Sequence, residues 1–297
     1  MTTLSYDPTH CTLCPRRCGA DRTQAKGRCR MPDAPVVARA ALHHWEEPPL
    51  SGTQGAGTVF FSGCSLGCVF CQNDSISQND FGKAISVARL REIFFELIAA
   101  GAHNIDLVNP THYAHAVAQA LEDPLPVPVV WNSGGYDRVE TLAALEGKIQ
   151  IYLPDYKYTD PDTARRYAGA ADYPETARAA IREMVRQTGP YQLDENGILT
   201  RGVILRHLLL PGGLNQAKEV MDWVAETFPP HTILFSLMSQ YTPWGKAADS
   251  PPLDRRLRKS EIRAAEAYFT NLDLDGFTQG VEAAQADYIP SFDLTGV

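Results

Sequence analysis

Three cysteines near the start of the chain have a spacing that suits metal chemistry. Cys64, Cys68 and Cys71 form a C-x3-C-x2-C run. Three thiolates can hold three irons of a 4Fe–4S cluster and leave the fourth iron without a protein ligand, and an open metal position is typical of catalytic sites. The alternatives are a zinc site or free thiols, but structural zinc takes four ligands and this run has three cysteines. The run therefore predicts a catalytic iron–sulfur cluster with one open coordination position.

The residues around these cysteines carry a specific resemblance. Residues 61–73, with Phe70 before the last cysteine and Asn73 shortly after it, resemble the cluster loop of the radical S-adenosylmethionine (SAM) superfamily, in the branch of the pyruvate formate-lyase activating enzyme. In that superfamily the open iron binds the amino and carboxylate groups of SAM. One electron from the cluster then yields a 5′-deoxyadenosyl radical, which abstracts hydrogen. The resemblance implies the same cofactors here, with the protein positioning and shielding the reacting groups.

The composition limits the other classes of function. The chain has 297 residues, 44% hydrophobic and 21% charged, which is enough to bury a sizeable core. A formal net charge of −8 argues against a general nucleic-acid binder. All seven cysteines lie within the first 71 residues, a pattern that favours metal ligation over a disulfide scaffold. With no secretory signal pattern and no long apolar stretch, we expect a soluble cytoplasmic protein without membrane or nucleic-acid partners.

A second cysteine group precedes the first. Cys11, Cys14, Cys18 and Cys29 form C-x2-C-x3-C-x10-C, a strong metal-binding pattern. Structural zinc commonly uses two C-x2-C pairs, whereas one is present here, and Pro15 follows Cys14 as in ferredoxin-like spacings. The pattern favours an auxiliary Fe–S cluster and leaves zinc as the alternative. Such a cluster could relay electrons, bind substrate or tie down the N-terminal segment.

The chain divides by composition at about residue 50. Residues 1–50 show little helical or strand periodicity and are interpreted as a Cys-rich metal-binding segment; residues 51–297 alternate apolar runs with amphipathic helices. Such alternation predicts an α/β fold with a mainly parallel sheet. The predicted strands are residues 58–63, 104–109, 127–131, 149–153, 203–210 and 232–238. The predicted helices are residues 86–100, 138–145, 174–186, 215–228 and 260–272. Ser86 is the predicted N-cap of the first. The superfamily resemblance implies that the six strands form a partial (β/α)6 barrel.

Polar residues and glycines gather where the predicted strands end, which is where α/β proteins place their sites. The segment Asp155-Tyr156-Lys157 resembles the Asp-x-Lys motif of the activating-enzyme branch, whose members contact SAM. A carboxylate suits ribose hydroxyls and an ammonium suits the SAM carboxylate. The segment Asn132-Ser133-Gly134 resembles the branch's Thr-Asn-Gly segment, and Arg206 with Pro211-Gly212 resembles its Arg-x-Val-Val-Pro-Gly strand. The predicted cofactor contacts are Asn109, Asn132, Ser133, Gly134, Asp155, Lys157, Arg206 and Gln240.

One segment departs from the family pattern. The family usually has Gly-Gly-Glu-Pro after the second strand, where backbone carbonyls receive the SAM amino group, and this chain has Leu107-Val108-Asn109-Pro110. Backbone carbonyls can still make that contact. His112 and His115 nearby are interpreted as a surface or capping pair, and His207 either as a core histidine or as a site residue.

The resemblance spans essentially the full chain and points to a subgroup described as similar to the pyruvate formate-lyase activating enzyme. It implies an enzyme that abstracts hydrogen from a substrate, by analogy a protein that receives a glycyl radical. The alternatives are radical chemistry on a small molecule or peptide, and a non-enzymatic Fe–S electron carrier. The expected partners are the substrate and an external electron donor such as flavodoxin or ferredoxin.

Overall fold

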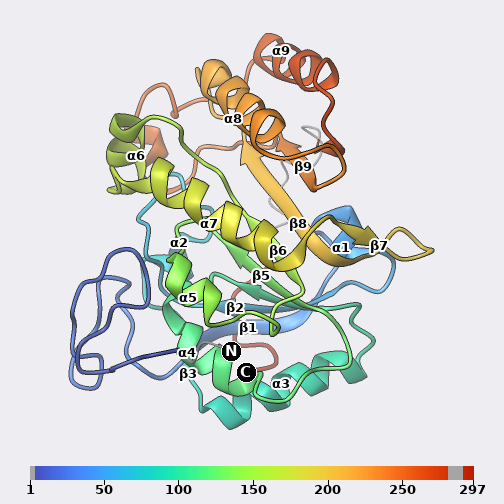
Figure 1. The fold of residues 1–297 in the computed structure, drawn as a ribbon. Helices are drawn as coiled ribbons and strands as arrows, with labels where there is room; N and C mark the ends of the chain where they lie inside the picture. Colours follow the sequence, from blue (N-terminus) through green and yellow to red (C-terminus); the bar gives the residue numbers. More distant parts are fainter. Residues whose placement is uncertain (1–3, 280–289) are drawn as a thin grey trace.

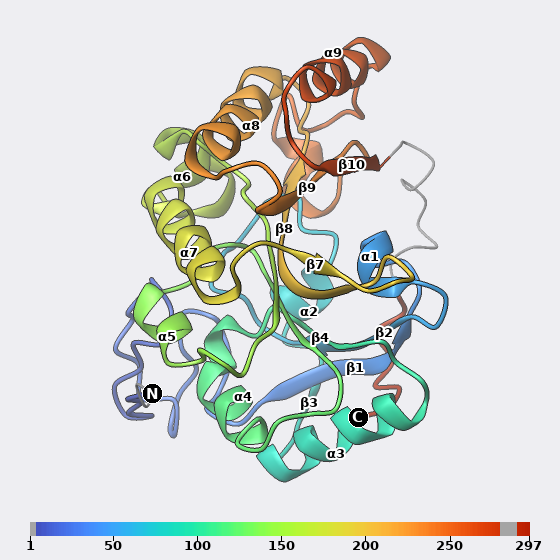
Figure 2. The same ribbon diagram turned by 45° about the vertical axis from the view of Figure 1, so that its right-hand side comes forward.

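A mainly parallel β-sheet with helices along one side forms the fold of the computed structural model, which describes residues 4–279 and 290–297 (Figures 1 and 2). The six predicted strands are all present, neighbour one another in chain order and run parallel. They are β2 (Ala56–Phe61), β4 (Ile105–Val108), β5 (Val129–Ser133), β6 (Ile151–Pro154), β8 (Leu199–Leu208) and β9 (Ile233–Met238). The predicted α/β fold is thereby confirmed.

Four further strands extend this sheet. They are β1 (Val36–His43), β3 (Lys83–Ala84), β7 (Gln192–Leu193) and β10 (Gly276–Gln279). Strand β1 is antiparallel to β2, and β10 is parallel to β9. The expectation of little strand structure within residues 1–50 is therefore wrong for β1. Its sequence shows no strict alternation because Val36, Val37 and Ala38 are buried in succession. The division of the chain into two parts at residue 50 stays a prediction. Strand β1 belongs to the sheet although it precedes that residue.

The five predicted helices are all present. The helices Ala114–Ala120 and Pro161–Ala168, and two helices of four residues, were not predicted. Figure 2 shows α3 to α9 arranged along one side of the sheet. The helices are α1 (Pro48–Ser51), α2 (Asp74–Ser77), α3 (Val87–Ala99), α4 (Ala114–Ala120), α5 (Val139–Ala143), α6 (Pro161–Ala168), α7 (Tyr173–Thr188), α8 (Leu214–Thr227) and α9 (Lys259–Thr270), with 3-10 turns η1 (Thr111–Tyr113) and η2 (Gly245–Asp249). The Ser86 hydroxyl caps α3 by accepting a hydrogen bond from the Arg89 amide at 3.1 Å, which confirms the predicted N-cap.

The two faces of the sheet have different surroundings. Because successive strand residues point to opposite faces, Leu107, Trp131 and Phe235 lie in the large core beneath the helices. Val130 and Ile204 lie in a smaller core on the other face, which Leu50 of α1 covers. We call this second face the inner face. Its apolar residues give way to charged ones toward the carboxyl ends of the strands.

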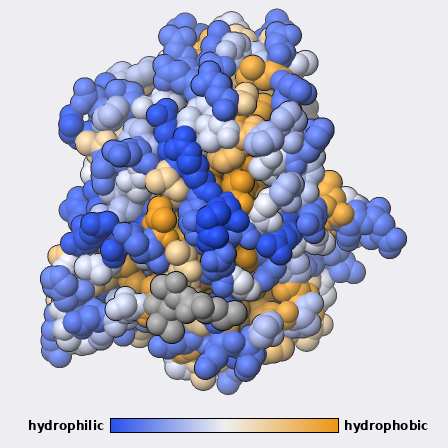
Figure 3. Space-filling model, viewed as in Figure 1, coloured by the Kyte–Doolittle hydropathy of each residue, from blue (hydrophilic) through white to orange (hydrophobic). Residues whose placement is uncertain are grey.

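The face of the molecule that is visible in Figure 3 is mainly polar. Figure 3 shows one face covered largely by hydrophilic residues, with smaller hydrophobic areas between them. Within the part of the chain that the structure describes, none of the helices has the length and hydrophobicity needed to span a bilayer.

Candidate functional site

The loop after β2 brings Cys64, Cys68 and Cys71 to the carboxyl end of the sheet. Each sulfur has an N–H or O–H group near it. The pairs are the Leu66 amide with Cys64 Sγ at 3.4 Å, the Tyr158 hydroxyl with Cys68 Sγ at 4.0 Å, and the Ser77 hydroxyl with Cys71 Sγ at 3.3 Å. Hydrogen bonds to ligating sulfurs are a usual way for a protein to tune an Fe–S cluster. These three residues therefore fit the cluster that the spacing predicts.

Burial governs the acidity of these thiols. It raises the pKa of Cys68 to about 11, against the opposing attraction of Lys157. Burial likewise raises the pKa of Cys64 and of Cys71. The free thiols are therefore neutral near pH 7. Binding of iron would stabilise the thiolates, so that cluster assembly releases protons.

Asp155, Lys157 and Arg206 form one ion-paired group at the ends of β6 and β8. The Lys157 ammonium lies 2.6 Å from one oxygen of Asp155, and Arg206 Nε lies 2.8 Å from the other. Burial raises the pKa of Asp155, but attraction by Arg206 and Lys157 outweighs it and brings that pKa below its ordinary value. The Asp155 carboxyl is thus an ionised hydrogen-bond acceptor at neutral pH.

The cysteine loop meets these strand ends at Gly134. A Cβ atom at Gly134 would lie 3.1 Å from Leu66 Cδ1 and 3.6 Å from Lys157 Cε. The cluster loop, the end of β5 and the end of β6 therefore converge at one point. The Tyr173 hydroxyl accepts a hydrogen bond from the Lys157 amide at 2.8 Å and keeps this backbone in place.

The other predicted cofactor contacts take different positions. Asn132 joins the ion-paired group, because its Oδ1 accepts a hydrogen bond from Arg206 at 2.7 Å. Asn109 has a left-handed backbone (φ 60°), and its side-chain amide donates to the carbonyl of Gly63 in the cluster loop. Ser133 instead donates to the buried carboxyl of Asp137.

Gln240 forms no hydrogen bond with the ion-paired group in the described part of the chain. Its Nε2 lies 4.0 Å from Met238 Sδ, and its buried Oε1 has no hydrogen-bond partner among the described residues. The structure therefore brings Asn132, Gly134, Asp155 and Lys157 together with Arg206. It ties Asn109 to the cluster loop and places Ser133 in a separate buried network.

The sequence-based reasoning missed three carboxyl groups on the inner face. Glu46 lies 3.0 Å from Arg206, and Glu47 accepts hydrogen bonds from Ser236 at 3.0 Å and Gln279 at 2.6 Å. Asp106 is fully buried within β4. A signal existed for Asp106, since a charged residue stood in the middle of a run predicted to be buried on both faces. None existed for Glu46 and Glu47, whose segment lacked periodicity.

Three histidines are buried rather than exposed. His112 Nε2 lies 2.7 Å from the Ser62 carbonyl, and His115 Nε2 lies 3.2 Å from Asp33. The prediction of a surface or capping pair is therefore wrong, because the N-terminal segment covers both residues and neither caps a helix among the described residues. His207 is a satisfied core histidine: its Nδ1 lies 2.7 Å from the Tyr156 carbonyl, and burial lowers its pKa to about 4.

The N-terminal cysteine segment packs directly on the cluster loop. The Cys64 amide donates a hydrogen bond to the Cys29 carbonyl at 3.3 Å. Arg22 of this segment is buried. One of its terminal nitrogens lies 2.6 Å from the His112 carbonyl oxygen and 3.7 Å from Cys11 Sγ. The two cysteine groups are thus adjacent. Among the described residues, no group of three or more His, Cys, Asp and Glu side chains is arranged to hold a single metal ion.

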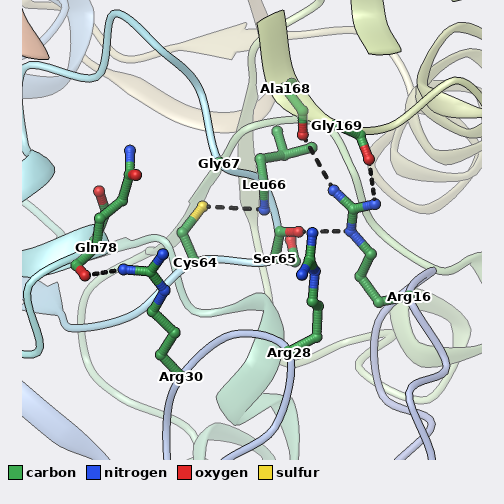
Figure 4. Close-up of a pocket in the computed structure, with 11 residues that line it drawn as sticks. Arg16, Arg28, Arg30, Cys64, Ser65, Leu66, Gly67, Gln78, Ala168 and Gly169 are labelled. Atoms are coloured by element: carbon green, nitrogen blue, oxygen red, sulfur yellow. Dashed lines mark hydrogen bonds between the residues drawn. The ribbon is translucent and has the colours of Figure 1, made fainter. Parts of the chain in front are cut away.

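Arginines of the N-terminal segment border the outer side of the cluster loop. Arg16, Arg28 and Arg30 line a pocket of about 140 Å³ together with Cys64 (Figure 4). Arg16 donates to the Ser65 carbonyl at 2.8 Å and so holds the loop against the N-terminal segment. The side of the loop that lines this pocket is therefore positively charged.

Comparison with known proteins agrees with this fold. No protein-family model matches the chain. The uncharacterized protein MJ0674 of Methanocaldococcus jannaschii is 30% identical over 279 residues, which cover 89% of this chain and 76% of that protein. Crystalline Streptococcus suis SuiB bound to precursor peptide SuiA superposes with a TM-score of 0.50 and 14% identity, covering 73% of this chain. The chain spans about half of SuiB, since the match covers 46% of it.

A weaker match involves a domain of the pyruvate-formate lyase-activating enzyme from Bacteroides vulgatus. Its TM-score is 0.39 at 14% identity, covering 65% of this chain and 91% of that domain, which is too low to support a conclusion. The fold is similar to that of radical SAM enzymes, as predicted. The predicted subgroup stays a prediction.

Proposed function

The chain belongs to the family of the uncharacterized protein MJ0674 of Methanocaldococcus jannaschii, and for it we propose a radical SAM reaction at Cys64, Cys68 and Cys71. The observation that carries this proposal is the convergence of the ends of β5 and β6 on the cysteine loop. Lys157, Gly134 and Leu66 meet there, and each cysteine sulfur has its own hydrogen-bond donor. A module that only binds metal does not need ion-paired side chains at several strand ends around it.

The residues present have distinct roles in this proposal. When bound, a 4Fe–4S cluster supplies the electron that cleaves SAM to methionine and a 5′-deoxyadenosyl radical. Lys157 binds the SAM carboxylate by charge, and the ionised Asp155 accepts hydrogen bonds from the ribose hydroxyls. Arg206 and Asn132 keep the Asp155 carboxyl oriented. Gly134 lets the backbone approach the loop, because a side chain there would contact both Leu66 and Lys157.

The substrate of the proposed reaction is a protein or peptide that loses a hydrogen atom to the radical. The resemblance to glycyl-radical activating enzymes supports a protein, and the fold shared with SuiB, crystallised with a precursor peptide, supports a peptide. An external flavodoxin or ferredoxin supplies the electron. The arginines beside Cys64 suit such a donor, since Arg16, Arg28 and Arg30 would attract an acidic protein surface.

The proposed reaction is tested by its product. The protein is reconstituted anaerobically with iron and sulfide, reduced with dithionite and mixed with SAM, and 5′-deoxyadenosine is quantified by liquid chromatography. We expect its formation to require reductant. A reconstituted protein with a reducible 4Fe–4S signal but no 5′-deoxyadenosine would contradict the proposal and favour an electron carrier.

Replacing Asp155 with alanine should weaken SAM binding while the cluster stays intact. The variant loses the acceptor for the ribose hydroxyls, and it leaves the Lys157 ammonium without its partner at 2.6 Å. Loss of a hydrogen bond to a charged group costs about 1.5–3 kcal/mol, so we expect SAM affinity to fall roughly 10- to 100-fold. Equilibrium binding measures the affinity, and absorbance and iron content report the cluster. Asp123→Ala, at an exposed carboxyl, is the control.

We also propose that Cys11, Cys14, Cys18 and Cys29 bind an auxiliary Fe–S cluster. The spacing supports this cluster, because it contains one C-x2-C pair rather than the two that structural zinc commonly uses, and Pro15 follows Cys14. Zinc is the alternative. Residues 1–50 then act as a metal-dependent segment on the domain of residues 51–297, and the hydrogen bond from Cys64 to Cys29 joins the two ligand loops.

Replacing Cys18 with alanine should loosen the N-terminal segment. Up to β1 this segment is built from turns, so the metal is expected to contribute directly to its folding. Limited proteolysis should then show new cleavage before residue 50. Loss of the metal without any new cleavage would mean that contacts such as those of Arg22 suffice to hold the segment.

A further inference from the structure

Asp137 is a buried carboxyl group to which the proposed reaction gives no role. Its Oδ1 accepts hydrogen bonds from the Thr111 hydroxyl at 2.6 Å and the Trp131 indole nitrogen at 3.2 Å. Its Oδ2 accepts one from the Ser133 hydroxyl. Burial raises the pKa of Asp137 against these three hydrogen bonds, and no basic group pairs with it among the described residues. Since burying a carboxyl without a cation is costly, its contribution lies in what its hydrogen bonds connect.

The donors to Asp137 come from two segments that are separate in sequence. Thr111 begins η1 in the loop after β4, whereas Trp131 and Ser133 belong to β5. The Ser133 hydroxyl also accepts a hydrogen bond from the Gly135 amide at 3.2 Å, and so extends the network beyond the end of β5. We call residues 109–111 and 133–135 the paired loops. The Asp137 carboxyl joins one of them to the other.

Both paired loops contact the cluster loop. In the first, the side-chain amide of Asn109 donates a hydrogen bond to the Gly63 carbonyl. In the second, a Cβ atom at Gly134 would lie 3.1 Å from Leu66 Cδ1. The cluster loop is thus contacted by one paired loop at Gly63 and by the other at Leu66. The spacing of the paired loops therefore affects where the cluster loop lies relative to the strand ends.

The second paired loop also contacts the backbone of Asp155. The Asp155 amide donates to the Ser133 carbonyl at 2.9 Å. Gly135 has a left-handed backbone (φ 72°), and a Cβ atom there would overlap the Asp155 carbonyl oxygen. Because Gly135 packs so closely on this carbonyl, a shift of Gly135 displaces Asp155. A continuous set of contacts therefore runs from Asp137 through Ser133 and Gly135 to Asp155.

We propose that Asp137 is a positioning residue for SAM, which acts by holding the paired loops together. The inference rests on the proposed function, in which Asp155 binds the ribose of SAM and the cluster loop holds the iron that SAM reaches. Asp137 touches neither group, but its two oxygens fix the loops that contact both. The O–H group of Ser133 is committed to Asp137, so Ser133 acts as a link in this network rather than as a donor to SAM.

Variants that remove one arm of the network test the inference. Thr111→Val frees the loop after β4 and Ser133→Ala frees the loop after β5, and neither changes the Asp137 carboxyl itself. SAM affinity is measured by equilibrium dialysis on the reconstituted, oxidised protein, with iron and sulfide content as the check on the cluster. Each variant should bind SAM about 10-fold more weakly, with unchanged cluster content. Asp137→Asn, which places an amide N–H group against a donor, should lose a similar factor.

A double variant separates positioning from a general loss of stability. Thr111→Val and Ser133→Ala act through one carboxyl, so together they should lose about as much SAM affinity as either alone, not the product of the two losses. Thr188→Val is the matched control. It removes a buried threonine hydroxyl that donates to the Met184 carbonyl at 3.0 Å, and it should lower the urea midpoint while SAM affinity stays that of wild type.

Three results would overturn the inference while SAM binding by the wild-type protein upholds the proposed function. They are unchanged SAM affinity in Thr111→Val and Ser133→Ala, losses that multiply in the double variant, and an equal loss of SAM affinity in Thr188→Val. Wild-type protein that carries its cluster but binds no SAM would instead overturn the proposed function, and the inference with it. The dialysis experiment thus distinguishes the two failures.

Discussion

Replacing Cys68 with alanine is expected to abolish 5′-deoxyadenosine formation and to remove the SAM-binding cluster. Cys68 is the central cysteine of the run, and its sulfur faces the Tyr158 hydroxyl at 4.0 Å. With two cysteines left, the cluster loses one of its three protein ligands. The open iron for SAM is then no longer defined. We expect activity to fall below detection, because the chemistry belongs to the cofactor rather than to a side chain.

The same variant separates the two cysteine groups. Iron and sulfide analysis, together with electron paramagnetic resonance, should show that Cys68→Ala keeps the metal of Cys11, Cys14, Cys18 and Cys29. Cys18→Ala is the reciprocal variant, which should keep the SAM-binding cluster signal. If Cys68→Ala still cleaved SAM, the assignment of the catalytic run would be wrong. If it lost both metals, the two sites would assemble together through their contact at Cys29 and Cys64.

Replacing Gly63 with alanine is expected to destabilise the protein by roughly 2–5 kcal/mol. Gly63 has a left-handed backbone (φ 81°), which costs a residue with a Cβ about 1–2 kcal/mol. A Cβ atom there would also lie 2.7 Å from the Cys29 carbonyl oxygen and would overlap Met31. Overpacking of this kind typically costs about 1–3 kcal/mol. The side chain would therefore push the N-terminal segment away from the cluster loop.

Gly67 provides a matched control in the same loop. A Cβ at Gly67 meets no atom within 4 Å, so Gly67→Ala should be nearly neutral. Chemical denaturation of both variants measures the difference, with the midpoint falling for Gly63→Ala. Cluster content should fall with it, since Cys64 follows Gly63 and its amide bonds to Cys29. Equal midpoints for the two variants would contradict the close packing of Met31 and the Cys29 carbonyl against Gly63.

Local patterns in the sequence were sufficient for much of the fold. The six parallel strands could be predicted because strands buried on both faces appear in the sequence as continuous apolar runs. The N-cap at Ser86 could be predicted because its hydrogen bond joins residues only three positions apart, Ser86 and Arg89. Strand β1 could not be predicted, because it forms by pairing with β2 and its own sequence lacks the alternation of a strand. His112 and His115 were misjudged for the same reason, since the segment that buries them is distant in sequence.

For the candidate site, too, some features could be predicted from the sequence and others required the tertiary structure. The sequence by itself determined the candidate ligands of the proposed cluster, because Cys64, Cys68 and Cys71 form a pattern that spans only a few residues. It also determined that Asp155 and Lys157 follow a strand. Only the tertiary structure decided what surrounds them. Glu46 reaches Arg206 across 160 residues of sequence, and the Asn132 amide donates to both Glu46 and Asp106. Such contacts depend on how strands and loops meet, which no local spacing encodes.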